Sequence, residues 1–351
     1  MSFAQQKPII GGSAVQPHEF PFAVYLSIET QPSWHAVCGG TLISDRHIVT
    51  AGHCLIHAPS AQAIKVGYGH AHVKQQTHAR VKRLQVHPQF NPRTLFNDIA
   101  VIELDTPIRQ TRTVHRVPVF FGSVEPGHVV TTVGWGITSN APGSHTVPAM
   151  NKVDLTVASP KSCRTVDESF QSSNGPFVCT GTQPGGRDEC SGDSGSPALV
   201  TVQAGKPLGS RDLALLRKFI NRAKSQHSSS ASSSIARHWR RPKAQAYSSP
   251  LAVDFLDMRL AALTSYGDNS HHDVHPPCGD PNGFGFSTHV AFYADFITNA
   301  TGLPRSELEA PLRLDRLADV RSSGASASNT AASVNHMLAL LVLVVTFLVG
   351  R

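Results

Sequence analysis

Short apolar or alternating runs dominate the chain from Ile9 to about Val200. Examples are "FAVYLSI", "DIAVIEL" and "HVVTTVGWG", which Gly, Pro, Asn and Ser residues separate. Short runs with such boundaries are typical of strands joined by turns. No helical period is sustained over this stretch, so the pattern predicts an all-β barrel or sandwich.

The pattern changes after residue 200. Residues 201–250 contain ten serines and the basic clusters "LLRKF" and "RHWRRPK", which predicts a disordered, low-complexity insertion. Within it, "LALLRKFI" could form one or two helical turns. Strand character returns in "LAVDFLDMRLAALTSYG", and "GFGFSTHVAFYADFITNA" ends with the spacing of an amphipathic terminal helix. Residues 304–336 are interpreted as a linker or stalk.

The last segment, residues 337–351, is hydrophobic. Its run "MLALLVLVVTFLVG" has no charge and is too short to span a bilayer comfortably. Together with the small polar residues before it, this run fits a glycosylphosphatidylinositol anchor signal, cleaved between Gly324 and Asn329. The alternative is a short tail anchor or a buried helix. An anchor signal requires entry into the secretory path, and residues 1–8 lack an apolar leader, so we interpret them as a truncated or pro-segment.

The positive charge is concentrated in the insertion. The net charge is +7, whereas residues 201–250 alone carry +9, so the remainder of the chain carries −2. The folded part is therefore not expected to bind nucleic acid. The insertion is either an exosite for anionic partners or a disordered or non-native segment without function; we favour the second interpretation.

Cysteine usage indicates an oxidising compartment. Six widely spaced cysteines without a C-x-x-C pair predict three disulfides, and a sequon at Asn299 predicts glycosylation. Histidines are numerous, but we interpret them as scattered solvated residues and expect no metal site. Residues 61–97 contain no Asp or Glu, so no calcium site is expected there. No cofactor is expected, because no nucleotide, haem or flavin motif occurs.

Three segments contain the parts of a nucleophilic serine site. "TAGHC" places His53 beside Cys54, "NDIAVIEL" places Asp98 at the start of an apolar strand, and "GDSG" places Ser194 between flexible glycines. A serine nucleophile needs a base, and the base needs a group that orients it. Such residues also form ordinary surface turns, so the GDSG motif alone would be a weak signal.

These motifs occur together with "IIGG", "CGGTLIS", "GWG" and "LTSYG", in the order of the chymotrypsin and trypsin family of serine endopeptidases. The chain resembles that family from Ile9 to about Ile297. The resemblance implies two six-stranded antiparallel β-barrels with a C-terminal helix. The peptidase domain would cover residues 9–303, with barrel one at about 9–118 and barrel two at about 119–297.

The resemblance also implies roles for individual residues. His53 would be the general base, Asp98 its orienting partner and Ser194 the nucleophile. The N–H groups of Gly192 and Ser194 would form the oxyanion hole. Ser265 would line the site, and the "SYG" segment that it begins would pair with the substrate backbone.

Substrate preference would depend on Asp188, six residues before Ser194. By resemblance it lies at the floor of the specificity pocket, where a carboxylate attracts Arg or Lys. Gly267 and Gly285 would form the pocket walls. The adjacent Glu189 departs from the family pattern, and it either sharpens the basic preference or points to solvent.

By the same resemblance, activation would pair a new α-amino group on Ile9 with Asp193 and so order the oxyanion hole. Here Pro8 precedes Ile9, whereas the usual activating cut follows Arg or Lys, so a different processing enzyme or a different upstream sequence is required. The resemblance further pairs the cysteines as Cys38 with Cys54, Cys163 with Cys179, and Cys190 with Cys278.

The sequence thus predicts a monomeric serine endopeptidase that is extracellular, either secreted or anchored to the outer cell surface. Its partners would be protein or peptide substrates with Arg or Lys at the cleaved position, together with protease inhibitors. Membrane contact would occur only through the C-terminal lipid anchor. The alternative is a catalytically inactive relative that acts as a binding or inhibitor protein.

Overall fold

The computed structural model describes residues 9–31, 34–181, 185–203, 205–218, 257–271, 273 and 276–312. The predicted pro-segment, the hydrophobic tail with its anchor signal, and most of the insertion and stalk lie outside the described residues. In the part of the chain that is described, no helix is both long enough and apolar enough to cross a membrane.

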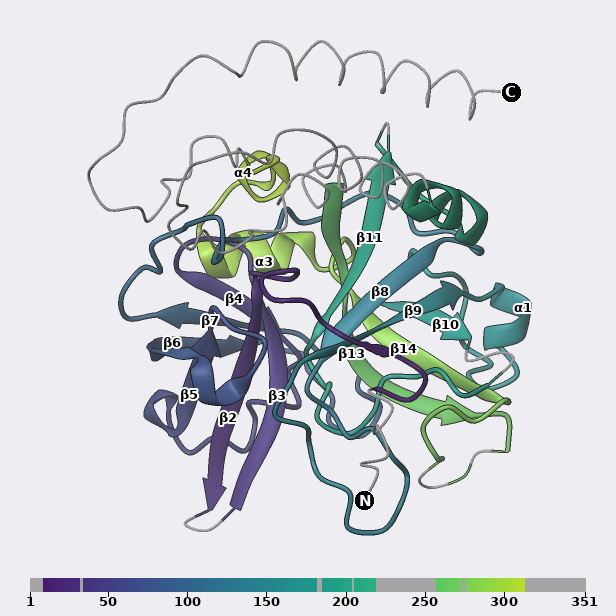
Figure 1. The fold of residues 1–351 in the computed structure, drawn as a ribbon, viewed down its shortest axis with the longest axis horizontal. Helices are drawn as coiled ribbons and strands as arrows, with labels where there is room; N and C mark the ends of the chain where they lie inside the picture. The colour runs from purple at the N-terminus through teal and green to yellow at the C-terminus, as the bar shows by residue number, and fades with distance from the viewer. Residues whose placement is uncertain are drawn as a thin grey trace, which may run out of the picture. The chain divides into compact units, whose positions relative to one another are not determined.

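The first barrel is a closed ring of six antiparallel strands in the order β2-β3-β4-β7-β6-β5 (Figure 1). Alternation places one face of each strand inside: in β5, Ile64 and Val66 are buried whereas Lys65 is exposed. Two 3₁₀ turns, η1 (Ala61–Ala63) and η2 (Val73–Gln75), connect the strands. The six strands are β2 (Ala23–Gln31), β3 (Trp34–Leu42), β4 (His47–Thr50), β5 (Ile64–Tyr68), β6 (Thr77–Val86) and β7 (Ala100–Leu104).

The second barrel is also a ring, in which antiparallel pairing runs β8-β9-β10-β14-β13-β11 and returns to β8. The predicted all-β fold with two six-stranded barrels is therefore confirmed (Figure 1). A short strand, β12 (Lys206–Pro207), pairs antiparallel with the end of β11. The six strands are β8 (Val129–Gly134), β9 (Asn151–Val157), β10 (Phe177–Gly181), β11 (Pro197–Gln203), β13 (Asp257–Asn269) and β14 (Gly283–His289).

The first described residues belong to the second barrel. Strand β1 (Ser13–Ala14) pairs with β9, and Ser13 lies opposite Lys152. Ile9 is fully buried against Val153 and Leu155. The prediction that barrel one begins at residue 9 is therefore wrong, because the apolar Ile9 finds its core on β9.

The predicted terminal helix is α3 (Ala294–Thr301), which packs Ile297 and Ala300 into the core cluster of barrel one. Asn299, the predicted glycosylation site, is exposed on this helix. The following helix, α4 (Arg305–Glu309), buries Leu308, whose carbonyl accepts a 2.9 Å hydrogen bond from Val119. Residues 304–309 therefore belong to the folded domain and not to the predicted stalk, because Leu308 anchors this segment to the domain.

The predicted insertion is structured in its first part. Residues 201–203 belong to β11, and residues 210–218 are helical. Leu213 packs with Val129 and Leu208, and Arg217 forms an ion pair with Asp154 of β9. The prediction of disorder from residue 201 is wrong up to residue 218, because these contacts fix the helical turn that the apolar spacing had allowed.

Three disulfides join the pairs that the resemblance implied: Cys38–Cys54, Cys163–Cys179 and Cys190–Cys278. The second of these attaches α1 (Pro160–Cys163) to β10. Disulfides of this kind are typical of proteins from oxidising compartments.

Candidate active site

His53 and Asp98 meet at one end of the β4–β7 pair. Nδ1 of His53 lies 2.7 Å from Oδ2 of Asp98, and the His53 backbone N–H donates to Oδ1 at 2.8 Å. The Asp98 side chain is fully buried, whereas the His53 side chain is 25% exposed. The carboxylate therefore fixes both the ring and the backbone of His53, and leaves Nε2 at the end of the ring that points away from Asp98.

Two hydroxyls of the second barrel hold Asp98 from the other side. Ser265 Oγ donates to Asp98 Oδ2 at 2.5 Å, and Thr288 Oγ1 donates to the Asp98 carbonyl at 2.8 Å. Ser265 was predicted to line the site, but not to bind Asp98. Nothing in the sequence indicated that Thr288 contacts the site. These bonds join the two barrels at Asp98, one through its carboxylate and the other through its backbone carbonyl.

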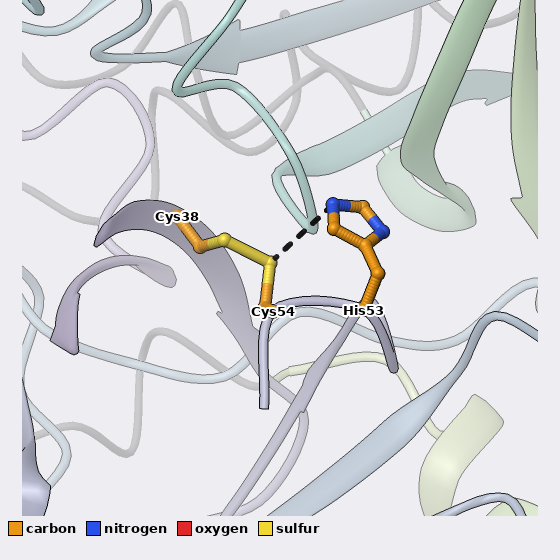
Figure 2. A group of neighbouring side chains, drawn as sticks. All are labelled: Cys38, His53 and Cys54. Carbon is orange, nitrogen blue, oxygen red and sulfur yellow. Dashed lines mark hydrogen bonds between the residues drawn. A yellow bond between two sulfur atoms is a disulfide. The ribbon is translucent and has the colours of Figure 1, made fainter. Parts of the chain in front are cut away.

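The Cys38–Cys54 disulfide lies directly beside His53 (Figure 2). Sγ of Cys54 is 3.9 Å from Nε2 of His53, and the three side chains place one potential ligand atom each within 4.8 Å of one another. Metal ions bind thiolates, and disulfide sulfurs are not thiolates. We therefore interpret this cluster as a covalent support for the His53 loop, which it ties to β3.

Ser194 lies in a tight turn that requires its glycines. The Asp193 N–H donates to Cys190 and the Ser196 N–H donates to Asp193, each at 2.9 Å. Gly192 and Gly195 have φ angles of 97° and 72°, and residues with a Cβ atom rarely adopt such positive φ angles. The turn therefore has a shape that few other sequences could form.

Contacts from three strands place this turn beside the His53 loop. The Gly39 N–H of β3 donates to the Ser194 carbonyl at 2.8 Å, and the Gly195 N–H donates to Thr264 of β13 at 2.7 Å. A Cβ atom on Gly195 would lie 2.1 Å from Oγ1 of Thr50, at the end of β4. The three residues of the predicted triad thus come from segments that meet between the two barrels.

The backbone N–H groups of Gly192 and Ser194 are unpaired. Neither donates a hydrogen bond to any described residue. The Ile137 N–H holds the neighbouring Ser191 carbonyl at 2.9 Å, so the chain before Ser194 is fixed from the opposite side. Two free donors on a rigid turn can bind an oxygen that carries negative charge.

The predicted pocket residues occupy neighbouring positions in the second barrel. Gly267 of β13 pairs directly with Gly285 of β14. Asp188 is 9% exposed, and its Oδ2 accepts a 2.9 Å hydrogen bond from Gly279. Burial, together with the nearby Glu189, raises the pKa of Asp188 to about 7.

Glu189 points into the barrel rather than to solvent. Its Oε1 accepts hydrogen bonds from the hydroxyls of Thr132, Thr264 and Ser287, at 3.1, 3.3 and 3.4 Å. Burial raises the pKa of Glu189 as well. This excludes the alternative that Glu189 points to solvent, whereas a sharper basic preference stays a prediction.

Asp193, the third acid of this region, is completely buried. It accepts hydrogen bonds from the N–H groups of Gly136, at 2.7 Å, and Cys190, at 3.0 Å, and burial raises its pKa to about 7. Among the described residues no side-chain cation pairs with Asp193. The expected pairing with an α-amino group on Ile9 stays a prediction.

Comparisons with known proteins agree with this geometry. A family model described as Trypsin matches residues 9–208. Trypsin of Phaedon cochleariae is 33% identical over 200 residues, which cover 56% of this chain and 75% of the relative. Human cathepsin G and human granzyme B are 31% and 33% identical over 202 residues, covering 56% of this chain and 75% and 78% of those proteins. The chain therefore belongs to the trypsin family and is a serine-type endopeptidase.

Proposed function

We propose that this endopeptidase cleaves after Arg or Lys by means of Ser194, His53 and Asp98. The observation that carries the proposal is the fully buried Asp98 carboxylate 2.7 Å from Nδ1 of His53, at the junction where the Ser194 turn lies. Nε2 of His53 takes the proton of Ser194 as its oxygen attacks the peptide carbonyl. The same nitrogen then protonates the leaving amine, while Asp98 stabilises the imidazolium.

The developing oxyanion would bind the N–H groups of Gly192 and Ser194. Both donors are unpaired among the described residues and belong to a turn whose conformation the glycines determine. Donors that are already oriented need no rearrangement when charge appears on the substrate oxygen. The loss of one such donor typically costs about 10² to 10³ in rate.

Charge supports the preference for basic substrates. Asp188 and Glu189 are both buried, and no described Lys, Arg or His side chain pairs with either. A buried carboxylate without a cation has to take up a proton or bind a charged partner. A substrate Arg or Lys side chain would supply that partner.

A substrate series tests this specificity. Matched peptides with Arg, Lys, Phe or Ala before the scissile bond are compared by kcat/KM at pH 6 and pH 8. We expect Arg and Lys to be preferred over Phe, and the Arg-to-Phe ratio to rise with pH. With its pKa raised to about 7, Asp188 is mostly protonated at pH 6 and mostly charged at pH 8.

The ratio of two substrates isolates the pocket, because an effect of pH on the common catalytic steps cancels between them. Burial also raises the pKa of the neighbouring acids Glu189 and Asp193, so we assign the expected pH dependence to this group of acids and not to Asp188 alone. A preference for Phe at pH 8, or a ratio that does not change with pH, would exclude the role assigned to Asp188.

We further propose that the enzyme is activated by release of the Ile9 α-amino group. Ile9 is already fully buried, and Asp193 has no cationic partner among the described residues. An ammonium group at Ile9 would compensate the Asp193 carboxylate and stabilise the turn that contains Gly192 and Ser194.

Pro8→Arg makes this activation testable. Immobilised trypsin would cut before Ile9, and we expect activity to rise by about 10² to 10³, the value of an ordered oxyanion donor. The matched control is Pro8→Ala, in which the cut after Lys7 leaves one extra residue before Ile9. The two variants share every other Lys and Arg, so trypsin cuts at those residues affect both variants equally and do not change the comparison of their activities. Equal activity of the cut variants, or full activity without cutting, would contradict the mechanism.

Localisation, oligomeric state and inhibitor binding are proposed on the same basis as the catalytic activity. Three disulfides fit an extracellular protein, and we propose secretion or surface anchoring of a monomer that protein-type protease inhibitors recognise. An inactive binding relative is disfavoured, because His53, Asp98 and Ser194 are all present and lie in adjoining segments. Reaction of Ser194 with an organophosphonate probe separates the two possibilities.

A further inference from the structure

We propose that Glu189 is a second specificity-determining residue, which binds the substrate side chain together with Asp188 and selects Arg over Lys. This inference rests on the proposed function, because it assigns a further residue to the same pocket. The two carboxylates would form a paired anionic site, with Asp188 at the floor and Glu189 at the wall.

The two carboxylate oxygens of Glu189 differ in their hydrogen bonds to the described residues. The described donors to the side chain, the hydroxyls of Thr132, Thr264 and Ser287, all bind Oε1. They come from β8, β13 and β14, so they fix the carboxylate in one orientation. Oε2 accepts no hydrogen bond from a described residue and remains available to a ligand.

The free oxygen lies at the predicted wall of the pocket. A Cβ atom on Gly285 would be 2.7 Å from Oε2 of Glu189, so only a glycine leaves this oxygen uncovered. Gly285 pairs with Gly267 on the adjacent strand. Glu189 is 9% exposed, so the residue is not completely enclosed. The absence of a side chain at Gly285 leaves the space next to Oε2 open.

The electrostatics of the region require a cation. Glu189 raises the pKa of Asp188, and Asp193 does so to a smaller extent, so the three acids lie close enough to repel one another. No described Lys, Arg or His side chain pairs with any of them. Once Ile9 has compensated Asp193, the pair Asp188 and Glu189 still lacks a partner.

The chemistry of the pair favours arginine. A guanidinium is planar and presents five N–H donors in a fixed arrangement, so it can bind two carboxylates at once. A lysine ammonium is a compact, strongly hydrated charge on a flexible chain, which gains less from a second acceptor at the wall. The structure therefore predicts a higher kcat/KM for Arg than for Lys substrates.

Glu189→Gln tests this prediction. The variant keeps the shape and an oxygen for the three hydroxyls, but loses the charge. We expect the Arg-to-Lys ratio of kcat/KM at pH 8 to fall about tenfold, the scale of one hydrogen bond to a charged group, and the Ki of benzamidine to rise. Glu168→Gln, which removes a charge at an exposed position, should leave both values unchanged.

Active-site titration with an organophosphonate normalises each preparation, so loss of folded protein is not mistaken for loss of specificity. If Glu189→Gln retains the parent Arg-to-Lys ratio with a full titre, the proposal is overturned and Glu189 is purely structural. If the parent itself neither reacts with the probe nor cleaves basic substrates, the proposed function fails instead.

A second variant keeps the proposal falsifiable if Glu189→Gln does not fold. Asp188→Asn removes the floor charge and leaves Glu189 in place. We expect this variant to keep a preference for Arg over Phe of about tenfold, because one hydrogen bond to a charged group remains. Complete loss of the Arg preference in Asp188→Asn would show that Glu189 does not bind the substrate, and would also overturn the proposal.

Discussion

Ser194→Ala abolishes peptide hydrolysis, with an expected loss of about 10⁶ in kcat, the scale seen when a serine protease loses its nucleophile. The reason is that the proposed mechanism uses the Ser194 hydroxyl as the attacking group, and alanine has no hydroxyl to replace it. Since alanine fits the same backbone, KM and the three disulfides should be unchanged. Initial rates with an Arg substrate, on material processed to begin at Ile9, measure the effect.

The matched control is Ser191→Ala in the same turn. Ser191 is exposed, and the contact that holds it is made by its backbone carbonyl to Ile137. This variant should hydrolyse the substrate at nearly the parent rate. Substrate binding and the oxyanion hole alone provide a residual activity well below a thousandth of the parent kcat. If Ser194→Ala retained more than about a thousandth of the parent kcat, the nucleophile would have to be a different residue.

The meeting of His53 with Asp98 could be predicted because it depends on strand pairing. His53 follows β4 and Asp98 precedes β7, and these strands pair with Thr50 opposite Ala100. Residues just beyond those two positions therefore lie at the same edge of the barrel. Both strands are almost continuously buried, and their apolar runs can be recognised in the sequence, whereas the pairing of His53 with Asp98 was implied by the family resemblance of the motifs that contain them.

The orientation of Glu189 could not be predicted, because no local pattern determines it. Its three hydroxyl partners lie in β8, β13 and β14, far from one another along the chain. Thr132, Thr264 and Ser287 are common residues in strands, and only the closed barrel brings them to one carboxylate. The same holds for Thr288, which supports Asp98 from a distant strand.

Element boundaries were the other source of error, for a related reason. The helix at residues 210–218 forms where Leu213 finds Val129 and Leu208, whereas composition alone suggested disorder. In the same way, Ile9 is buried against Val153 and Leu155 of β9, so the first described residues pack on the second barrel. In each case a few apolar side chains found a tertiary partner, and that gain outweighed a local pattern rich in polar residues.

The fixed donors around Asp98 determine the outcome of Asp98→Asn. One carboxylate oxygen, Oδ1, accepts from the His53 backbone N–H, which cannot become an acceptor. The amide of the variant must therefore place its oxygen there and turn its NH₂ group toward Nδ1 of His53 and Oγ of Ser265. Nδ1 then has to accept a hydrogen bond, so the ring proton moves to Nε2.

A proton on Nε2 prevents His53 from accepting the proton of Ser194, so we expect kcat to fall about 10⁴-fold, as in the same change to a chymotrypsin-type triad. Benzamidine binding and KM should stay near the parent values, because the pocket around Asp188 is untouched. Asp105→Asn, at an exposed position on the same barrel, is the control and should retain full activity. A kcat within tenfold of the parent, on correctly folded and processed Asp98→Asn protein, would mean that the buried carboxylate does not determine the histidine tautomer, and the chemistry assigned to Ser194 would lose its base.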